Sequence, residues 1–270
     1  MSVRSIVRSA GRVASSIGRR KTTLRNLFFG LLFASPWLIG LLIFYVYPIF
    51  VSLYYSFTNF NLMNVPQWVG VANYVELFGH DETVQISIVN TITYALMAIP
   101  AAVVVAIILA LLLNVRDLIG RTAYRSLYFL PVLMPAVATG ILWKWVLDPQ
   151  WGLVNSLLDM VGILGPGWLG SEHWSKPSMA LIAVWGVGQT VVIYLAGLQD
   201  VPRDLYDAAE VDGANGAQKI RYVTLPMISP VIFFNLIMSL IGTFQTFTLP
   251  FVISGGDGKP AQSLMFYSMY

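Results

Sequence analysis

Long apolar runs without a single charge constrain this chain more than any other feature. The first run extends from Asn26 to Val75, and later runs are similarly free of charge. About 20 apolar residues suffice for a helix to cross the hydrocarbon of a bilayer. Only 11% of the 270 residues are charged and 57% are hydrophobic, whereas soluble domains carry about 25% charged residues. The chain is therefore predicted to be an all-α polytopic membrane protein.

Five membrane spans are predicted from these runs. The first run is too long for one helix, and residues 61–66 break it with two asparagines and a proline. The predicted spans cover about residues 27–57, 87–114, 126–147, 178–197 and 227–253. They belong to one transmembrane domain, residues 26–270, which follows a basic segment, residues 1–25.

Prolines and small residues predict how the spans pack. Each proline within a span frees a carbonyl that a neighbouring helix or water must satisfy, so a kinked bundle is expected around Pro36, Pro48, Pro100, Pro131 and Pro135. Gly186 and Gly188 in the fourth span indicate either close helix contact or the lining of a pathway. Gln189 beside them needs a polar partner, because a buried amide in hydrocarbon is costly.

The distribution of lysine and arginine predicts the orientation. Basic residues gather in segments that would lie on one side: residues 1–25, residues 115–125 and the loop 198–226. Because such segments stay in the cytoplasm, the N-terminus and the 198–226 loop are predicted to be cytoplasmic. The helical spacing of apolar residues from Val3 to Ile17 fits a basic helix lying on an anionic leaflet, and a disordered basic tail that only sets topology remains an alternative.

The 198–226 loop carries five acids and three bases between two apolar runs. Pro202 suits the first turn of a short helix, with Asp200 as a possible cap, and Gly213 permits a turn after Asp212. A second short amphipathic helix is expected before Pro226 starts the fifth span. Two short helices with small residues between them form either a docking surface or an ordinary polar loop.

At this point the residues carry a resemblance. The chain resembles permease subunits of bacterial ABC importers, in the carbohydrate-uptake branch and of the maltose-transporter-like, first-subunit type. The coupling loop of that family, called the EAA loop, is matched by Asp207-Ala208-Ala209, Asp212-Gly213-Ala214, Leu225-Pro226 and Pro230. Further matching segments are Pro36–Gly40, Tyr47-Pro48, Trp68–Tyr74, Asn90-Thr91, Leu130-Pro131 and Ser254–Gly256. The family usually has Glu at the place of Asp207 and often Phe at the place of Ile220.

The resemblance implies the function, the partners and the location. It implies an ATP-driven importer subunit that moves a sugar, oligosaccharide or related polyol by alternating access, in a bacterial plasma (inner) membrane. The implied partners are a second homologous permease, an ABC ATPase dimer, an extracytoplasmic solute-binding protein and membrane lipids. ATP and magnesium would be bound by the ATPase, so no cofactor is expected in this chain. The family core has six spans, so the resemblance implies a sixth span, which is absent from the five expected in this chain.

The coupling residues implied by the resemblance lie in the 198–226 loop. They are Asp207, Ala208, Ala209, Glu210, Asp212, Gly213, Ala214, Leu225 and Pro226. The small residues among them would enter a cleft of the ATPase. Asp207 and Glu210 either pair with bases of that subunit or remain solvated surface charges.

A cargo path is predicted from polar and aromatic residues in the fourth and fifth spans. Hydroxyl and amide groups beside aromatic rings suit a sugar, although the same groups also bond helices to one another. The candidate residues are Trp185, Gln189, Tyr194, Ser239, Thr243, Gln245 and Thr246.

Other classes of protein fit the sequence less well. The spans hold no acid–base pair for catalysis, and cysteine is absent, so neither an enzyme nor a metal site is expected. The lysine of Gly256–Pro260 lacks the following serine or threonine of a phosphate loop. The net charge of +3 follows membrane topology and does not indicate nucleic-acid binding. A secondary transporter or channel subunit remains the alternative, although such proteins usually carry intramembrane acids.

Overall fold

The computed structural model describes residues 25–115 and 118–270. These residues fall into two compact units, one ending at His80 and the other covering Asp81–Tyr270. The described residues form helices and one isolated bridge, between Thr58 and Trp68. The predicted helix or tail at residues 3–17 lies outside the described part of the chain.

The first unit contains one helix long enough to cross a membrane, Arg25–Tyr55. Its π-helical segment η1 (Leu42–Val46) precedes α2 (Tyr47–Tyr55). Pro48 lacks the N–H that would continue the α-helical bonding, and a wider turn directly before a proline accommodates that loss. The helix ends two residues before the predicted limit.

The loop after this helix folds back on the helix end. The Asn73 amide donates to the carbonyls of Ser56 and Thr58 at 2.9 and 2.8 Å. The ring of Phe57 stacks on Trp68 with centroids 5.4 Å apart. A short helix, α3 (Ala72–Gly79), completes the unit. Two residues of the Trp68–Tyr74 motif therefore hold this loop in place.

The second unit is a helical bundle around the 32-residue helix α4 (Glu82–Leu113). Asp81 caps α4 by accepting the backbone N–H groups of Thr83 and Val84 at 2.9 and 3.3 Å. The other elements of this unit are α5 (Arg121–Phe129), η2 (Leu130–Leu133), α6 (Ala136–Val146), α7 (Leu153–Met160), α8 (Glu172–Trp185), α9 (Gly188–Gln199), α10 (Arg203–Val211), α11 (Gly216–Lys219), η3 (Ile220–Thr224), α12 (Leu225–Phe244), α13 (Thr248–Ser254) and η4 (Tyr267–Met269).

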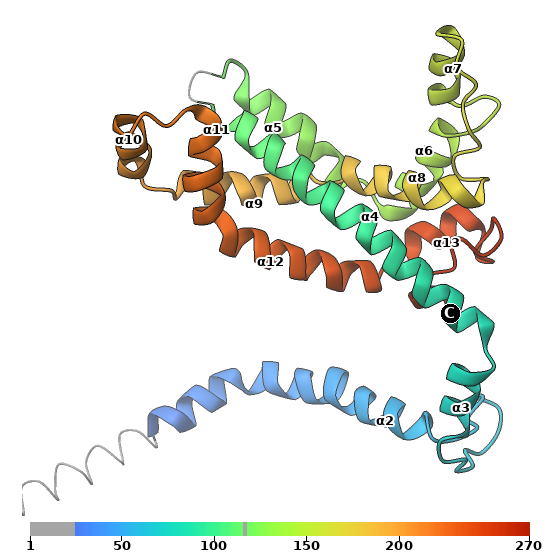
Figure 1. Cartoon of the computed structure of the whole chain (residues 1–270). Coiled ribbons are helices and arrows are strands. Elements are labelled where there is room, and N and C mark those ends of the chain that lie inside the picture. The colour runs from blue at the N-terminus through green and yellow to red at the C-terminus, as the bar shows by residue number, and fades with distance from the viewer. Residues whose placement is uncertain (1–24, 116–117) are drawn as a thin grey trace, which may run out of the picture. The chain divides into compact units, whose positions relative to one another are not determined.

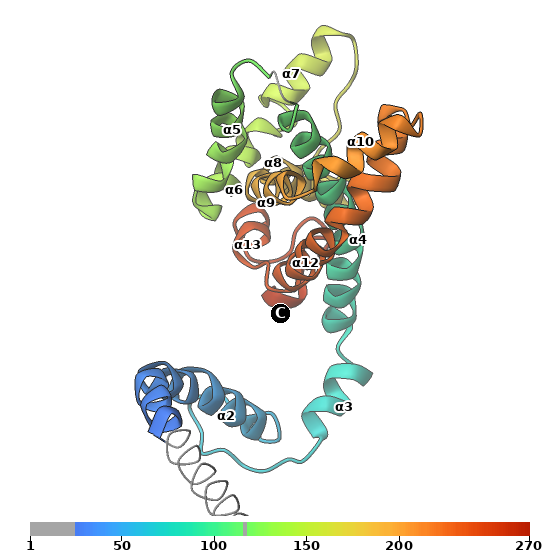
Figure 2. The same cartoon turned by 90° about the vertical axis from the view of Figure 1, so that its left-hand side faces the viewer.

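Helices α8, α9 and α12 pack on α4, and α6 packs on α13 (Figures 1 and 2). Small side chains of α4 make the close approach possible. Ala106 and Ala110 are fully buried against Val191 and Tyr194 of α9 and Ile228 of α12. The alanine face of α4 is therefore the surface on which α9 and α12 pack in this part of the core.

Two of the predicted spans are bent helix pairs. The third bends by 102° between Thr122–Leu133 and Ala136–Val146. Met134 is extended there because the residue before a proline avoids helical geometry, and Pro135 then precedes α6. The fourth bends by 50° between α8 and α9. Three described helices are long and apolar enough to cross a membrane, and the number reaches five when each bent pair counts as one span.

The fifth predicted span differs at both ends. The expectation that Pro226 starts a new helix is wrong, because α11, η3 and α12 form one continuous helix, Gly216–Phe244. The π-helical turns of η3 lie directly before Pro226 and accommodate its missing N–H. The helix ends at Phe244, and the last residues of the predicted span form a separate helix, α13.

Candidate functional site

Helix α10 and the start of the following helix form the 198–226 loop at one end of the bundle. Figures 1 and 2 show α10 projecting from the end where α4 and α9 finish. Pro202 lies at the cap position and α10 begins at Arg203. The expected role of Asp200 as a cap is wrong, because Asp200 terminates α9. Of the predicted coupling residues, Asp207, Ala208, Glu210, Asp212 and Gly213 are exposed, and Ala209 and Ala214 are half-buried.

The turn between α10 and α11 explains the small residues of the Asp212-Gly213-Ala214 segment. Gly213 has φ +78°, a left-handed conformation that side chains disfavour. Its N–H donates to the Glu210 carbonyl at 3.0 Å, and the Ala214 N–H donates to the Ala209 carbonyl at 2.9 Å. This pair of bonds is the Schellman arrangement that closes a helix C-terminus. The predicted turn at Gly213 is therefore confirmed.

Helix α11 begins at Gly216, with Asn215 as its N-cap directly after Ala214. Asn215 and Gln218 form a capping box, in which the side chain of each accepts the backbone N–H of the other at 2.9 and 2.7 Å. The two short helices are thus separated only by a turn whose backbone bonds are satisfied locally. The turn presents a defined, small-residue surface to solvent.

Two side-chain contacts join α10 to the long helix. The hydroxyl groups of Tyr206 and Thr224 lie 2.9 Å apart, and Thr224 is buried. Tyr206 also packs on the core formed by α4, α9 and α12. Lys219 donates to Glu210 with Nζ and Oε2 2.7 Å apart. These contacts connect α10 directly to the helix that carries the fifth span.

The Lys219 contact also fixes the charge of Glu210. The hydrogen bond and the positive charge of Lys219 lower the pKa of Glu210 below its ordinary value. The contribution of this pair is complete above the ordinary carboxyl pKa and is lost as the pH falls through the lowered one. Exposed pairs of this kind contribute little to stability. Glu210 is therefore engaged within the loop, whereas no hydrogen bond or ion pair of the Asp207 carboxylate is found among the described residues.

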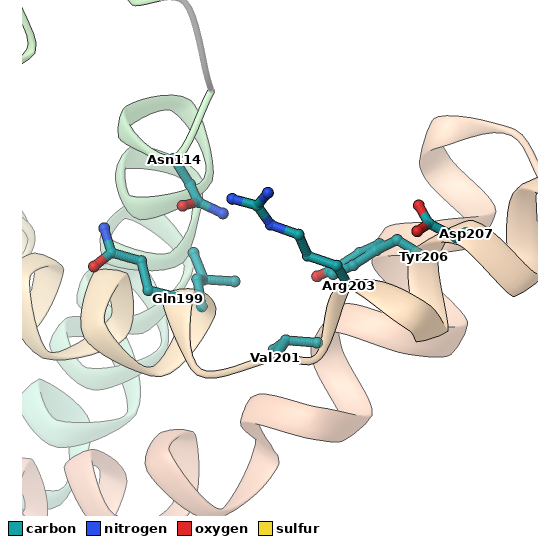
Figure 3. A pocket seen from close by; sticks show the side chains of 7 residues that line it. Asn114, Gln199, Val201, Arg203, Tyr206 and Asp207 are labelled. Carbon is teal, nitrogen blue, oxygen red and sulfur yellow. The ribbon is translucent and has the colours of Figure 1, made fainter.

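A polar pocket of about 650 Å³ lies behind α10. In Figure 3 the Arg203 guanidinium extends toward Asn114, the C-cap residue of α4, and Asp207 also lines the pocket, from the next turn of α10 beside Tyr206. Gln199 at the end of α9 and Tyr206 also line this pocket. The other two predicted coupling residues lie at the start of α12, where Leu225 is half-buried against the core and Pro226 is exposed.

The second predicted site is brought together only in part. A cavity of about 210 Å³ lies between α4, α8, α9 and α12. Ser239, Thr243 and Thr246 line it as one face of α12 and its C-terminal end. The Thr243 and Thr246 hydroxyls donate to the carbonyls of Ser239 and Gly242. Their lone pairs remain available to a ligand in the cavity.

Four predicted path residues do not line this cavity. Gln189 and Gln245 are exposed, and the ring of Trp185 packs on Trp143 at 5.6 Å. Tyr194 is fully buried in the core beside α4. The bend after α8 separates Trp185 from the face of α9, so helical spacing across residues 185–194 does not describe one face.

The cavity also contains residues that were not predicted from the sequence. Tyr94, Ala98 and Ala102 of α4 line it at spacings of four, and Thr190 lines it from α9. The sequence signal for these residues was an aromatic residue followed by two alanines on one helical face, which indicates a ring beside open space. Within the described residues, no group of three or more histidine or acidic side chains is placed to hold a metal ion.

Comparison with known proteins identifies the family. Residues 86–270 match the model of the binding-protein-dependent transport system inner membrane component. The probable ABC transporter permease protein YesP of Bacillus subtilis is 36% identical over 262 residues, covering 96% of this chain and 84% of the relative. The lactose transport system permease protein LacF of Rhizobium radiobacter is 34% identical, covering 89% and 81%. The arabinooligosaccharides transport system permease protein AraP of Bacillus subtilis is 33% identical, covering 82% and 71%.

A solved structure agrees with this grouping. It is the crystal structure of a bacterial ABC transporter involved in the import of the acidic polysaccharide alginate, with TM-score 0.70 and 26% identity, covering 96% of this chain and 85% of that chain. These matches favour an ABC permease over a secondary transporter or channel subunit. The chain belongs to the family of binding-protein-dependent transport system inner membrane components, and it is a multi-pass permease subunit of an ABC importer, a transport subunit and not an enzyme.

Proposed function

We propose that this permease imports a sugar, an oligosaccharide or a related polyol by alternating access, driven by a separate ATPase that docks on α10. The exposed turn at Gly213 carries the docking proposal. This turn lies between two short helices, and one of them continues without interruption into α12. Relatives named for lactose and arabinooligosaccharides support the cargo class.

The proposed orientation places α10 and the N-terminus in the cytoplasm. The bases of the 198–226 loop and of residues 1–25 support this side. The coupling residues are then Asp207, Ala208, Ala209, Glu210, Asp212, Gly213, Ala214, Leu225 and Pro226. Asp207 is proposed to pair with bases of the ATPase, whereas Glu210 is already paired with Lys219.

The proposed assembly contains a second homologous permease, an ATPase dimer that binds ATP and magnesium, and an extracytoplasmic solute-binding protein. A further solved structure with the same fold is that of an alginate transporter in complex with an alginate pentasaccharide-bound periplasmic protein (TM-score 0.71, 24% identity, covering 93% of this chain and 88% of that chain). The exposed apolar faces of α12 and of the helix Arg25–Tyr55 are proposed to contact lipid and the second permease. In this assembly ATP hydrolysis belongs to the partner subunit.

The cavity between α4, α9 and α12 is proposed as this subunit's part of the cargo path. Ser239, Thr243 and Thr246 line it together with Tyr94. Such a set provides hydrogen bonds for a sugar's hydroxyl groups and a surface for its apolar face. Gln189 and Gln245 are exposed on this chain, so they would reach cargo only from the surface proposed to meet the second permease.

Replacement of Ser239 by alanine and of Thr243 by valine is expected to weaken transport affinity about twofold to tenfold for the preferred carbohydrate, because each removes one hydrogen-bonding group. The ranking of a panel of mono- and oligosaccharides should also change. Uptake by reconstituted complexes, with assembly measured in parallel, is the test.

Ser229→Ala provides the matched control. Ser229 lies on the same helix and donates to the Pro226 carbonyl at 2.8 Å, but it is not part of the cavity wall. The control should retain wild-type affinity and ranking. If Ser239→Ala and Thr243→Val lower only the amount of assembled complex, with unchanged affinity and ranking, these hydroxyls act in helix packing and the cargo path is refuted.

A further inference from the structure

Asn90 and Thr91, a motif in the first part of α4, bind a distant segment of the chain. The Asn90 amide donates to the carbonyls of Gln262 and Met265 at 2.7 and 3.0 Å. The Thr91 hydroxyl accepts the backbone N–H of Tyr267 at 2.9 Å. Both side chains are buried, at 6% and 1% exposure. Neither residue belongs to the proposed coupling surface, and neither lines the proposed cargo cavity.

The segment that they bind, residues 258–270, is called here the closing segment. Leu264 and Phe266 within it are fully buried, and the hydroxyl of Ser263 lies 2.7 Å from that of Ser175 on α8. Gln262 has φ +57°, a left-handed backbone conformation that a non-glycine residue seldom adopts. The Asn90 amide binds the carbonyl of this same residue, so it supports a backbone conformation that is unfavourable by itself.

The closing segment contacts two residues that line the cavity between α4, α9 and α12. The ring of Phe266 stacks on Tyr94 with centroids 5.0 Å apart and planes 21° apart. The Ser268 hydroxyl donates to the carbonyl of Thr246. Tyr94 and Thr246 both line the cavity. Figure 1 shows the C-terminal end of the chain beside the first half of α4 and near α13.

Asn90 and Thr91 lie on α4 close to Tyr94, the residue that Phe266 contacts. Asn90 precedes Tyr94 by one helical turn, so both side chains lie on the same face of α4. Loss of the Asn90 amide would remove the side-chain donor to the Met265 carbonyl and one of the two donors to the Gln262 carbonyl, which also accepts the Met265 N–H at 2.9 Å. Phe266 would then lose the bond that anchors its neighbour Met265, while its packing against Leu264 and Met179 would remain.

We propose that Asn90 and Thr91 are positioning residues of the transport step, which hold the closing segment over the extracytoplasmic end of the cargo cavity. This inference rests on the proposed orientation and cargo path. Opening of the path to the outside then requires that the three hydrogen bonds from this motif break or rearrange. The motif acts on the cargo through Phe266 and Tyr94, without touching the cargo itself. This arrangement, in which Asn90 and Thr91 hold the closing segment in place, is called here the latch.

The absence of cysteine from the chain allows a direct test. Ser239→Cys places a single thiol in the cavity wall, and a membrane-impermeant maleimide added outside reports access to it. The protein is the assembled importer in proteoliposomes, without ATP. Asn90→Ala is expected to raise the labelling rate about tenfold, and Thr91→Val, which keeps the size of the side chain, is expected to raise it severalfold.

Asn155→Ala is the matched control. Asn155 is also a buried asparagine whose amide donates to two backbone carbonyls, those of Pro149 and Pro166, but it holds the segment around α7. It should leave the labelling of the Ser239→Cys thiol unchanged. An unchanged rate in both Asn90→Ala and Thr91→Val, or an equal rise in Asn155→Ala, would overturn the latch.

Two further measurements separate failure of the latch from failure of the proposed function. Leu164→Cys, at a position 93% exposed near α7, should be labelled rapidly from outside in every variant. Failure of that labelling would overturn the orientation and with it the outer location of the closing segment. A transported carbohydrate should slow labelling of the Ser239→Cys thiol, and no protection by any carbohydrate that the complex imports would refute the cargo path independently of the latch.

Discussion

Replacement of Gly213 by valine is expected to lower uptake more than tenfold while the permease remains inserted in the membrane and assembled. Gly213 has φ +78°. A left-handed conformation costs an L-residue about 1–2 kcal/mol, and a branched Cβ is the least tolerant of it. The bonds from Gly213 and Ala214 to α10 would be distorted. The surface proposed to enter the ATPase would therefore change shape, and ATP hydrolysis would continue without transport.

Two control variants separate backbone conformation from bulk. Gly213→Asn should retain much of the activity, because asparagine tolerates the left-handed region better than other residues. Gly216→Ala should be close to wild type, because Gly216 begins α11 with ordinary dihedral angles and a Cβ there meets no atom within 4 Å. The ratio of carbohydrate imported to ATP hydrolysed is the quantity to measure. A wild-type ratio in Gly213→Val would exclude this turn from coupling.

Replacement of Gly188 by alanine is expected to destabilise the bundle by about 1–3 kcal/mol, the range for overpacking a close contact. A Cβ at this position would lie 2.1 Å from the carbonyl oxygen of Tyr128 and 3.1 Å from the Cα of Phe129. These atoms belong to the backbone at the junction of α5 and η2, so they cannot move aside as a flexible side chain can. Helices α5 and α9 would have to separate.

Gly186→Ala is the comparison for this prediction. The nearest atom to a Cβ at Gly186 is the Ala183 carbonyl oxygen at 3.5 Å, an ordinary contact. Thermal unfolding of the two purified variants in one detergent should show a lower midpoint for Gly188→Ala. Equal midpoints would show that the approach of α9 to Tyr128 does not limit the stability of the bundle.

Local chemistry made several features predictable from the sequence. Gly213 was expected in a turn because glycine enters the left-handed region freely, and its φ confirms this. Gly188 was expected at a close contact, and the backbone of Tyr128 provides it. The break after the first long helix was also expected, and Leu62 within it has φ +66°. In each case a residue and its near neighbours determine the outcome.

Features that depend on distant partners were not predictable from the sequence. A proline signals a bend, but the 102° angle at Pro135 depends on where α6 packs against α13. Gln189 was predicted to need a polar partner inside a span and is exposed instead, while its neighbour Thr190 lines the cavity. Asn90 was recognised only as part of a motif, and its partners lie 172 and 175 residues away. Tertiary packing determines the bend angle, the exposure and the bonding partners in these cases.

The most direct test of the central claim measures carbohydrate uptake by proteoliposomes that contain this permease, the second permease, the ATPase and the solute-binding protein. Uptake should require ATP and the ATPase, and it should fall to background when the ATPase is omitted or carries a hydrolysis-deficient substitution. Proton or sodium gradients should not restore it. Carbohydrate uptake that persists without the ATPase and follows an imposed ion gradient would contradict an importer driven by ATP through α10.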